Sequence, residues 1–119
     1  MYQTPNVAIV MAQCCQTKQY YGIRFEERSQ GHWVGDWAFA IKETVGKKEG
    51  YDRVEVQGSI ELSDDYPGCP HCENMSIAQC SCQKVGCWDG VSQYFTCPYC
   101  GHGGRLEGSI VGFEGGGRF

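Results

Sequence analysis

Residues 69–100, CPHCENMSIAQCSCQKVGCWDGVSQYFTCPYC, decide the fold of this 119-residue chain. The stretch holds seven of the nine cysteines in 32 positions, and two of its cysteine pairs have the form Cys-Pro-x-Cys. Two thiolates three positions apart in a tight turn can bind one metal ion, and proline fixes the φ angle that such a turn needs. A glycine after the second cysteine, such as Gly101, lets backbone N–H groups turn toward the sulfurs. The pattern predicts zinc knuckles and therefore structural zinc.

Disulfide bonds are the alternative explanation for nine cysteines, and they fit this chain poorly. The apolar run at residues 7–12 has no basic residue before it and is too short for a secretory signal or a membrane span. An odd number of cysteines also leaves one thiol without a disulfide partner. We therefore expect a cytoplasmic location, no membrane association, and reduced cysteines that are available to metal.

Seven clustered cysteines are one ligand short of two tetrahedral sites, which is the coordination that structural zinc adopts. Four other side chains could supply the eighth ligand: Cys14, Cys15, His71 and His102. His71 lies inside a knuckle that directs it away from the metal and into solvent, and His102 would have to bend back. An N-terminal cysteine is favoured, because its coordination would explain these thiols and pin the first strand to the metal region.

The cysteines can be divided between two metal ions in two ways. In the crossed arrangement, one ion takes Cys80, Cys82, Cys97 and Cys100, and the other takes Cys69, Cys72, Cys87 and the N-terminal cysteine. In a plain ribbon, the two Cys-Pro-x-Cys pairs share one ion and the remaining cysteines share the other. We favour the crossed arrangement. Either one gives two closed all-thiolate Zn²⁺ sites without an open coordination position, so no enzymatic activity is expected.

A continuous apolar, partly β-branched run predicts a short buried strand at residues 7–12. Alternating apolar residues predict strands at residues 19–27, 33–42 and 51–62, with 44–50 as a loop or a single helical turn. Residues 1–66 are expected to form a small antiparallel β-meander whose inner face carries Tyr21, Phe25, Trp37 and Phe39. Residues 67–119 are expected to form the zinc-ribbon-like knuckle region. It would contain a strand at 76–79, a hairpin of 84–88 with 93–96, and an irregular glycine-rich tail. The predicted fold class is mainly β, in one composite domain.

The order of the cysteines resembles that of the TerY-C metal-binding domain family. The likeness rests on CPHCEN, AQCSC, KVGCWDG, TCPYCGHGG and GFEGGGR, and more loosely on a cysteine before TKQYYGIRF. Gln83 departs from the family pattern, which has glycine there. The resemblance implies two Zn²⁺ ions and Cys14, rather than Cys15, as the eighth ligand. The implied ligands are Cys14, Cys69, Cys72, Cys80, Cys82, Cys87, Cys97 and Cys100.

The resemblance also implies a place in bacterial tellurite-resistance or stress-response systems. There the domain usually follows a von Willebrand A domain, and a protein kinase and a protein phosphatase are encoded beside it. A chain of 119 residues has no room for the von Willebrand A domain. The expected function is a zinc-stapled scaffold that binds a protein partner, namely the kinase, the phosphatase or a von Willebrand A domain protein. Trp33 and Trp88 are candidate contacts, although both suit packing.

Two further functions are weaker alternatives. A nucleic-acid-binding zinc ribbon needs basic surface, but the formal charge is −4, and a change of −2 at each all-thiolate site would bring it to −8. Acidic residues also interleave with the basic ones, which are Lys18, Arg24, Arg28, Lys42, Lys47, Lys48 and Arg53. A thiol-based redox or metal sensor is the other alternative, and it is disfavoured because zinc ligation passivates thiols.

Overall fold

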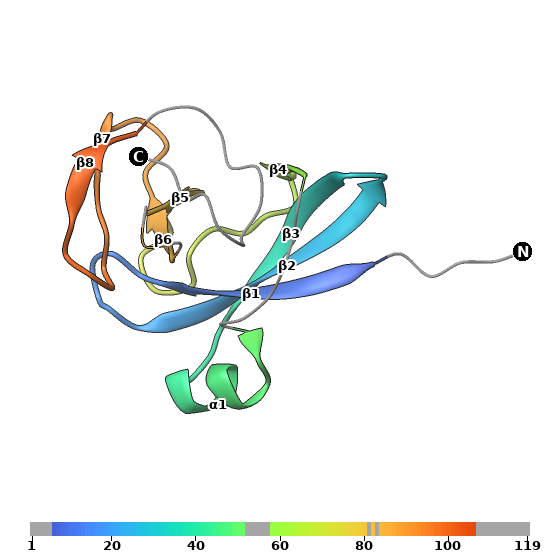
Figure 1. The fold of residues 1–119 in the computed structure, drawn as a ribbon, viewed down its shortest axis with the longest axis horizontal. Coiled ribbons are helices and arrows are strands. Elements are labelled where there is room, and N and C mark those ends of the chain that lie inside the picture. The colour runs from blue at the N-terminus through green and yellow to red at the C-terminus, as the bar shows by residue number, and fades with distance from the viewer. Residues whose placement is uncertain (1–5, 52–57, 81, 83, 107–119) are drawn as a thin grey trace, which may run out of the picture.

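The computed structural model describes residues 6–51, 58–80, 82 and 84–106. This part of the chain is mainly β, as the sequence predicts, and it has one short helix (Figure 1). No helix in these residues is long and apolar enough to cross a membrane. The elements are β1 (Val7–Gln13), β2 (Tyr20–Ser29), β3 (His32–Ala40), α1 (Glu43–Lys48), β4 (Ser59–Leu62), β5 (Ser76–Gln79), β6 (Val85–Trp88), β7 (Tyr94–Thr96) and β8 (Gly103–Arg105).

Six strands form one sheet in the order β4-β3-β2-β1-β6-β5. The antiparallel meander of β1, β2 and β3 is present as predicted. The fourth strand differs, because β4 runs parallel to β3 after a crossover that contains α1. Residues 52–57 of the predicted strand at 51–62 lie outside the described residues, and the strand occupies Ser59–Leu62.

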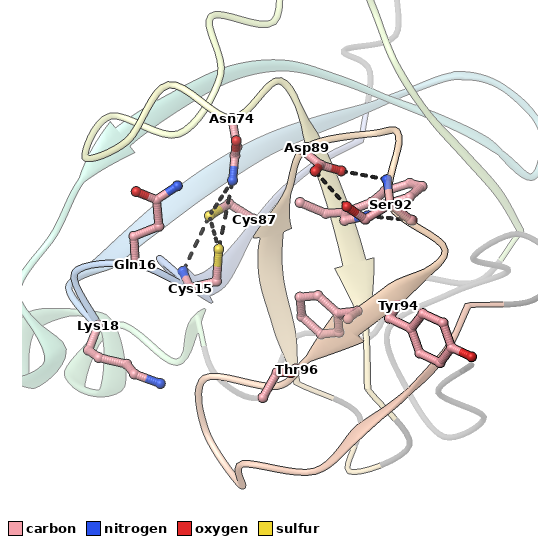
Figure 2. Close-up of a pocket in the computed structure, with 11 residues that line it drawn as sticks. Cys15, Gln16, Lys18, Asn74, Cys87, Asp89, Ser92, Tyr94 and Thr96 are labelled. Atoms are coloured by element: carbon pink, nitrogen blue, oxygen red, sulfur yellow. Dashed lines mark hydrogen bonds between the residues drawn. The ribbon is translucent and has the colours of Figure 1, made fainter.

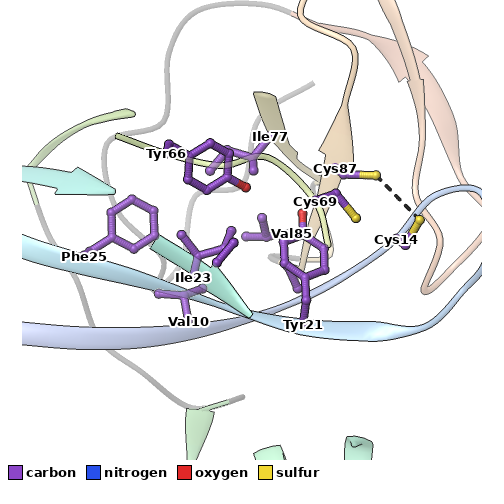
Figure 3. Close-up of a cluster of buried hydrophobic side chains, with 12 residues drawn as sticks. Val10, Cys14, Tyr21, Ile23, Phe25, Tyr66, Cys69, Ile77, Val85 and Cys87 are labelled. Atoms are coloured by element: carbon purple, nitrogen blue, oxygen red, sulfur yellow. Dashed lines mark hydrogen bonds between the residues drawn. The ribbon is translucent and has the colours of Figure 1, made fainter. Parts of the chain in front are cut away.

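The two faces of the meander carry different aromatic residues. Tyr21 and Phe25 point into the main core, where both are fully buried (Figure 3). The prediction that Trp37 and Phe39 share this face was wrong, since the register pairs Phe39 with Gly22 and Trp37 with Arg24 on the opposite face. At the C-terminal end of β3 the core-facing positions are instead small: Ala40 and Ala38 lie opposite Tyr21 and Ile23, which leaves room for the side chains of β2.

Strand β6 joins the meander to the C-terminal region. It pairs parallel with β1 on one side and antiparallel with β5 on the other. Both edges of β6 are therefore occupied, so the predicted hairpin of residues 84–88 with 93–96 does not form. Strand β7 pairs with β8 in a separate two-stranded sheet, which also shows that part of the glycine-rich tail is regular. The tail residues 107–119 lie outside the described part of the chain.

A second, smaller core lies on the other face of β6. Val85 and Cys87 belong to the main core, whereas Gly86 points toward Phe95 and Pro98. A Cβ atom placed on Gly86 would lie 2.9 Å from the Phe95 ring and 3.0 Å from Pro98, so this close approach requires glycine. Strand β6 thus contributes to two cores at once, and each core contains cysteines.

Candidate metal centres

The first centre is formed by Cys14, Cys69, Cys72 and Cys87, whose sulfur atoms all lie within 4.8 Å of one another. Cys14 directly follows β1, Cys87 lies in β6, and the other two come from the first Cys-Pro-x-Cys turn. The Cys87 sulfur is 3.4 Å from that of Cys72 and 3.9 Å from that of Cys14. Three of these cysteines are buried and belong to the main core (Figure 3). The centre therefore joins three segments that are far apart in sequence.

The second centre is formed by Cys80, Cys82, Cys97 and Cys100, again with all sulfur atoms within 4.8 Å of one another. Cys80 follows β5, and Cys97 follows β7. Two of the four, Cys82 and Cys100, are exposed, so this centre lies closer to the surface than the first. The structure groups the cysteines in the crossed arrangement, and the two Cys-Pro-x-Cys turns fall in different centres. Each group could hold one metal ion.

Three turns in the two centres share one backbone pattern. In each turn, the N–H of the first cysteine donates a hydrogen bond of 2.8–2.9 Å to the carbonyl oxygen of the residue five positions later. The carbonyl oxygen of the same cysteine accepts a hydrogen bond of 2.8–3.0 Å from the N–H of the residue four positions later. The turns begin at Cys14, Cys69 and Cys97. The fifth residue of each turn has positive φ: Lys18 (65°), Glu73 (68°) and Gly101 (76°). Two turns are the predicted knuckles, and the third was not predicted.

The third turn explains why Cys14 is the N-terminal cysteine of the first centre. Thr17 occupies the position that a second cysteine has in the other two turns, and its N–H donates to the Cys14 sulfur at 3.4 Å. Cys87, which comes from β6, completes the group of four. The sequence signal for this turn is weak, because only one of the two knuckle cysteines is present at residues 14–19.

The protonation of the thiols depends on their burial. Burial raises the pKa of Cys72 to about 11 and that of Cys97 to about 12, and it also raises the pKa of Cys69 and Cys87. Cys14 differs: burial acts to raise its pKa, but hydrogen bonds from Thr17 and Gln16 lower it to about 6. A bound dication would stabilise all of these thiolates, so metal binding would release protons and its affinity would fall in acid.

The remaining candidate ligands lie outside both groups. His71 points away from the first centre as predicted, but it is half-buried instead of exposed to solvent, because its Nε2 lies 2.8 Å from the Tyr20 carbonyl oxygen. His102 is exposed and belongs to neither group. Cys15 also belongs to neither, although its sulfur is 3.3 Å from that of Cys87.

A cavity of about 340 Å³ opens beside the first centre (Figure 2). Cys15, Cys87 and Asn74 form one wall, and residues of β7 and of the turn after β6 form the others. In that turn Asp89 accepts hydrogen bonds from the N–H groups of Val91 and Ser92, both at 2.9 Å. The sequence predicted the turn but not the cavity, because the cavity depends on how β7 is placed against β6.

The chain matches no family model, and no curated protein or solved structure is significantly similar to it. The assignment to the TerY-C family rests on the quoted motifs and on the order of the cysteines, and it stays a prediction.

The two Cys-Pro-x-Cys turns give a matched pair of stability predictions. Replacing Glu73 by glycine should leave the free energy of unfolding unchanged or raise it by up to about 1 kcal/mol, because a side chain at positive φ costs about 1–2 kcal/mol. Gly101→Ala should lower it by about 1 kcal/mol, since no atom within 4 Å would obstruct the new Cβ and only the backbone cost remains. Urea unfolding of both metal-loaded variants measures the difference. Equal destabilisation by the two substitutions would contradict the shared turn.

Proposed function

We propose that the chain is a structural zinc module that presents a rigid surface to a protein partner. The observation that carries the proposal is the convergence of eight cysteines into two closed groups of four. Four thiolates suit tetrahedral Zn²⁺, and closed sites of this kind stabilise folds, whereas catalytic zinc keeps a position for water or substrate. The first group ties β1 and β6 to the Cys-Pro-x-Cys turn between β4 and β5, so the metal would fix the shape of the six-stranded sheet.

The outer face of the meander is the surface that best fits a partner. Trp37 lies on this face in β3 and is 54% exposed, which is unusual for so large an apolar side chain. Its neighbour across the strands is Arg24, whose guanidinium lies 2.6 Å from the Asp36 carboxylate. An exposed tryptophan beside an ordered arginine is typical of the centre of a protein–protein interface.

The two tryptophans selected from the sequence are less suitable contacts. Trp33 packs against the main core. Trp88 packs against the second core, and its indole N–H donates to the Ser92 carbonyl at 3.0 Å. Both rings therefore have partners within the fold, which supports the packing role that the sequence also allowed.

Ion pairing on the outer face favours a protein over a nucleic acid. Arg24 and Arg28 each contact both Glu26 and Asp36, with the four N–O distances between 2.6 and 3.4 Å. Lys47 on α1 pairs with Glu43 at 2.9 Å. Phosphate binding would have to compete with these carboxylates, so the basic residues form a mixed charged surface and not a continuous positive one.

The resemblance to the TerY-C family indicates which partners to test. We propose a von Willebrand A domain protein, or the kinase or phosphatase encoded beside such domains, in a bacterial tellurite-resistance or stress-response system. The chain itself would then have no catalytic role. Elemental analysis of the reduced protein should find two Zn²⁺ per chain. Protein without bound zinc would contradict the proposed structural zinc module itself.

Trp37→Ala should weaken binding to the true partner by about 2 kcal/mol, or roughly 30-fold in Kd, without changing zinc content or unfolding midpoint. Calorimetric titration of the zinc-loaded domain against each purified candidate measures this. Tyr94→Ala is the matched control, since Tyr94 is 69% exposed but lies on β7, away from the meander. Equal weakening of partner binding by both variants would argue against the outer face of the meander as the binding surface. Salt-dependent binding to duplex DNA, without binding to any candidate protein, would favour the nucleic-acid alternative.

A further inference from the structure

Cys15 is the ninth cysteine and the one that neither metal centre uses. Its sulfur lies 3.3 Å from the Cys87 sulfur, which is closer to Cys87 than the sulfurs of Cys72 (3.4 Å) and Cys14 (3.9 Å) are. The Cys15 N–H also donates to the Cys87 sulfur at 3.3 Å. The Asn74 amide reaches both sulfurs, at 3.7 Å from Cys15 and 3.6 Å from Cys87. These contacts hold an unligated thiol directly against a ligand.

The cavity beside the first centre gives access to Cys15. Cys15 is half-buried and Cys87 is fully buried, and both line the same wall (Figure 2). Figure 2 shows the two sulfurs side by side, on the part of the wall that also carries Gln16 and Asn74. A cavity of about 340 Å³ is far larger than a hydroperoxide, so a small oxidant can reach the Cys15 sulfur without opening of the fold.

We propose that Cys15 is a modification site for hydroperoxides, and that oxidised Cys15 forms a disulfide with Cys87 and so removes a ligand from the first metal centre. The proposal rests on the metal binding proposed above. In the metal-loaded protein the four ligand sulfurs share their electrons with the ion, whereas the Cys15 sulfur does not. Cys15 is therefore the sulfur in this region that should react first.

The chemistry balances in two steps. The Cys15 sulfur attacks the hydroperoxide, the O–O bond breaks, and the products are Cys15 sulfenic acid and water or an alcohol. The Cys87 thiolate then attacks the Cys15 sulfur, so that the S–S bond forms and the S–O bond breaks. Hydroxide leaves and takes a proton from solvent. The two sulfurs together lose two electrons to the peroxide, and Cys87 would no longer be available as a metal ligand.

The second centre provides an internal control. The sequence contains nine cysteines, and with eight in the two groups only Cys15 remains, so Cys80, Cys82, Cys97 and Cys100 have no equivalent fifth thiol. Oxidation through Cys15 should therefore release metal from the first centre and spare the second. Because Cys87 lies in β6 and Cys14 follows β1, this release of metal would weaken the parallel pairing of β1 with β6.

The test uses the full zinc-loaded chain and hydrogen peroxide. Zinc content is measured first, then metal release is followed with a chromogenic chelator, and disulfides are mapped by mass spectrometry of the digested protein. We expect loss of one of the two zinc ions together with a Cys15–Cys87 disulfide, and recovery of both zinc ions after treatment with dithiothreitol and Zn²⁺. Cys15→Ser and Cys15→Ala should bind two zinc ions and release them several-fold more slowly.

The outcomes separate this inference from the proposed function. If the untreated protein holds two zinc ions, and peroxide releases metal equally fast from the wild type and both Cys15 variants, the inference is overturned and the structural role stands. A first disulfide that links two ligands and omits Cys15 would also overturn it. If the untreated protein holds no zinc, the structural role fails, and the disulfide map alone then decides whether Cys15 and Cys87 react together.

Discussion

Cys87→Ser should leave one bound metal ion per chain and should unfold the sheet around β1 and β6. Cys87 is the member of the first group of four cysteines that comes from β6, and it is fully buried in the main core. A serine hydroxyl is a poor substitute for a thiolate. Binding of a structural zinc contributes on the order of 10–16 kcal/mol. A domain is typically stable by only about 5–15 kcal/mol, so the loss of this ion is comparable to the whole free energy of unfolding.

Native mass spectrometry counts the ions, and circular dichroism during urea unfolding follows the sheet. Cys15→Ser is the matched control, since the sulfurs of the two residues are 3.3 Å apart and the substitution is the same. The control should keep two ions and nearly all of its stability. A Cys87→Ser protein that holds two ions and unfolds at the wild-type midpoint would show that Cys87 is not a ligand.

The arrangement of the metal centres followed from local sequence patterns. Two Cys-Pro-x-Cys turns and the counting of ligands identified two groups of four, because knuckle geometry is set within a few residues. The crossed grouping was favoured and is the one that the structure shows. The choice of Cys14 over Cys15 came from the family resemblance. The structure adds a physical reason, which is the knuckle-like turn that starts at Cys14 and has Thr17 in place of the second cysteine.

One error arose where distant segments compete for the same strand edge, and the other arose from a register shift between neighbouring strands. The hairpin of residues 84–88 with 93–96 was plausible locally, but β1 and β5 occupy both edges of β6. Trp37 was placed in the core because alternation within one strand does not reveal how that strand is paired with the next one. The register between β2 and β3 shifts between Arg24 and Phe25, which places Trp37 on the outer face. Pairing between segments far apart in sequence is not encoded in local periodicity.

The second centre should be separable from the sheet. Its four cysteines all lie between residues 80 and 100, and the second core of Ala78, Cys80, Phe95 and Cys97 is distinct from the main core. Cys97→Ser should therefore release one metal ion and unfold the β7–β8 unit, while β1, β2 and β3 stay folded. The close contact of Gly86 with Phe95 and Pro98 transmits some of the loss to β6, so β5 and β6 should show an intermediate effect.

Hydrogen exchange followed by mass spectrometry distinguishes the two centres. In Cys97→Ser, amides of β7 and β8 should exchange at nearly unfolded rates, whereas those of β1 and β2 should keep their protection. Cys87→Ser should give the opposite order, with the largest loss in β1 and β6. Equal loss of protection in all strands of both variants would mean that the centres and the sheet form one cooperative unit. The Gly86 contact would then couple the two cores more strongly than their separate packing indicates, because both cores meet on the two faces of β6.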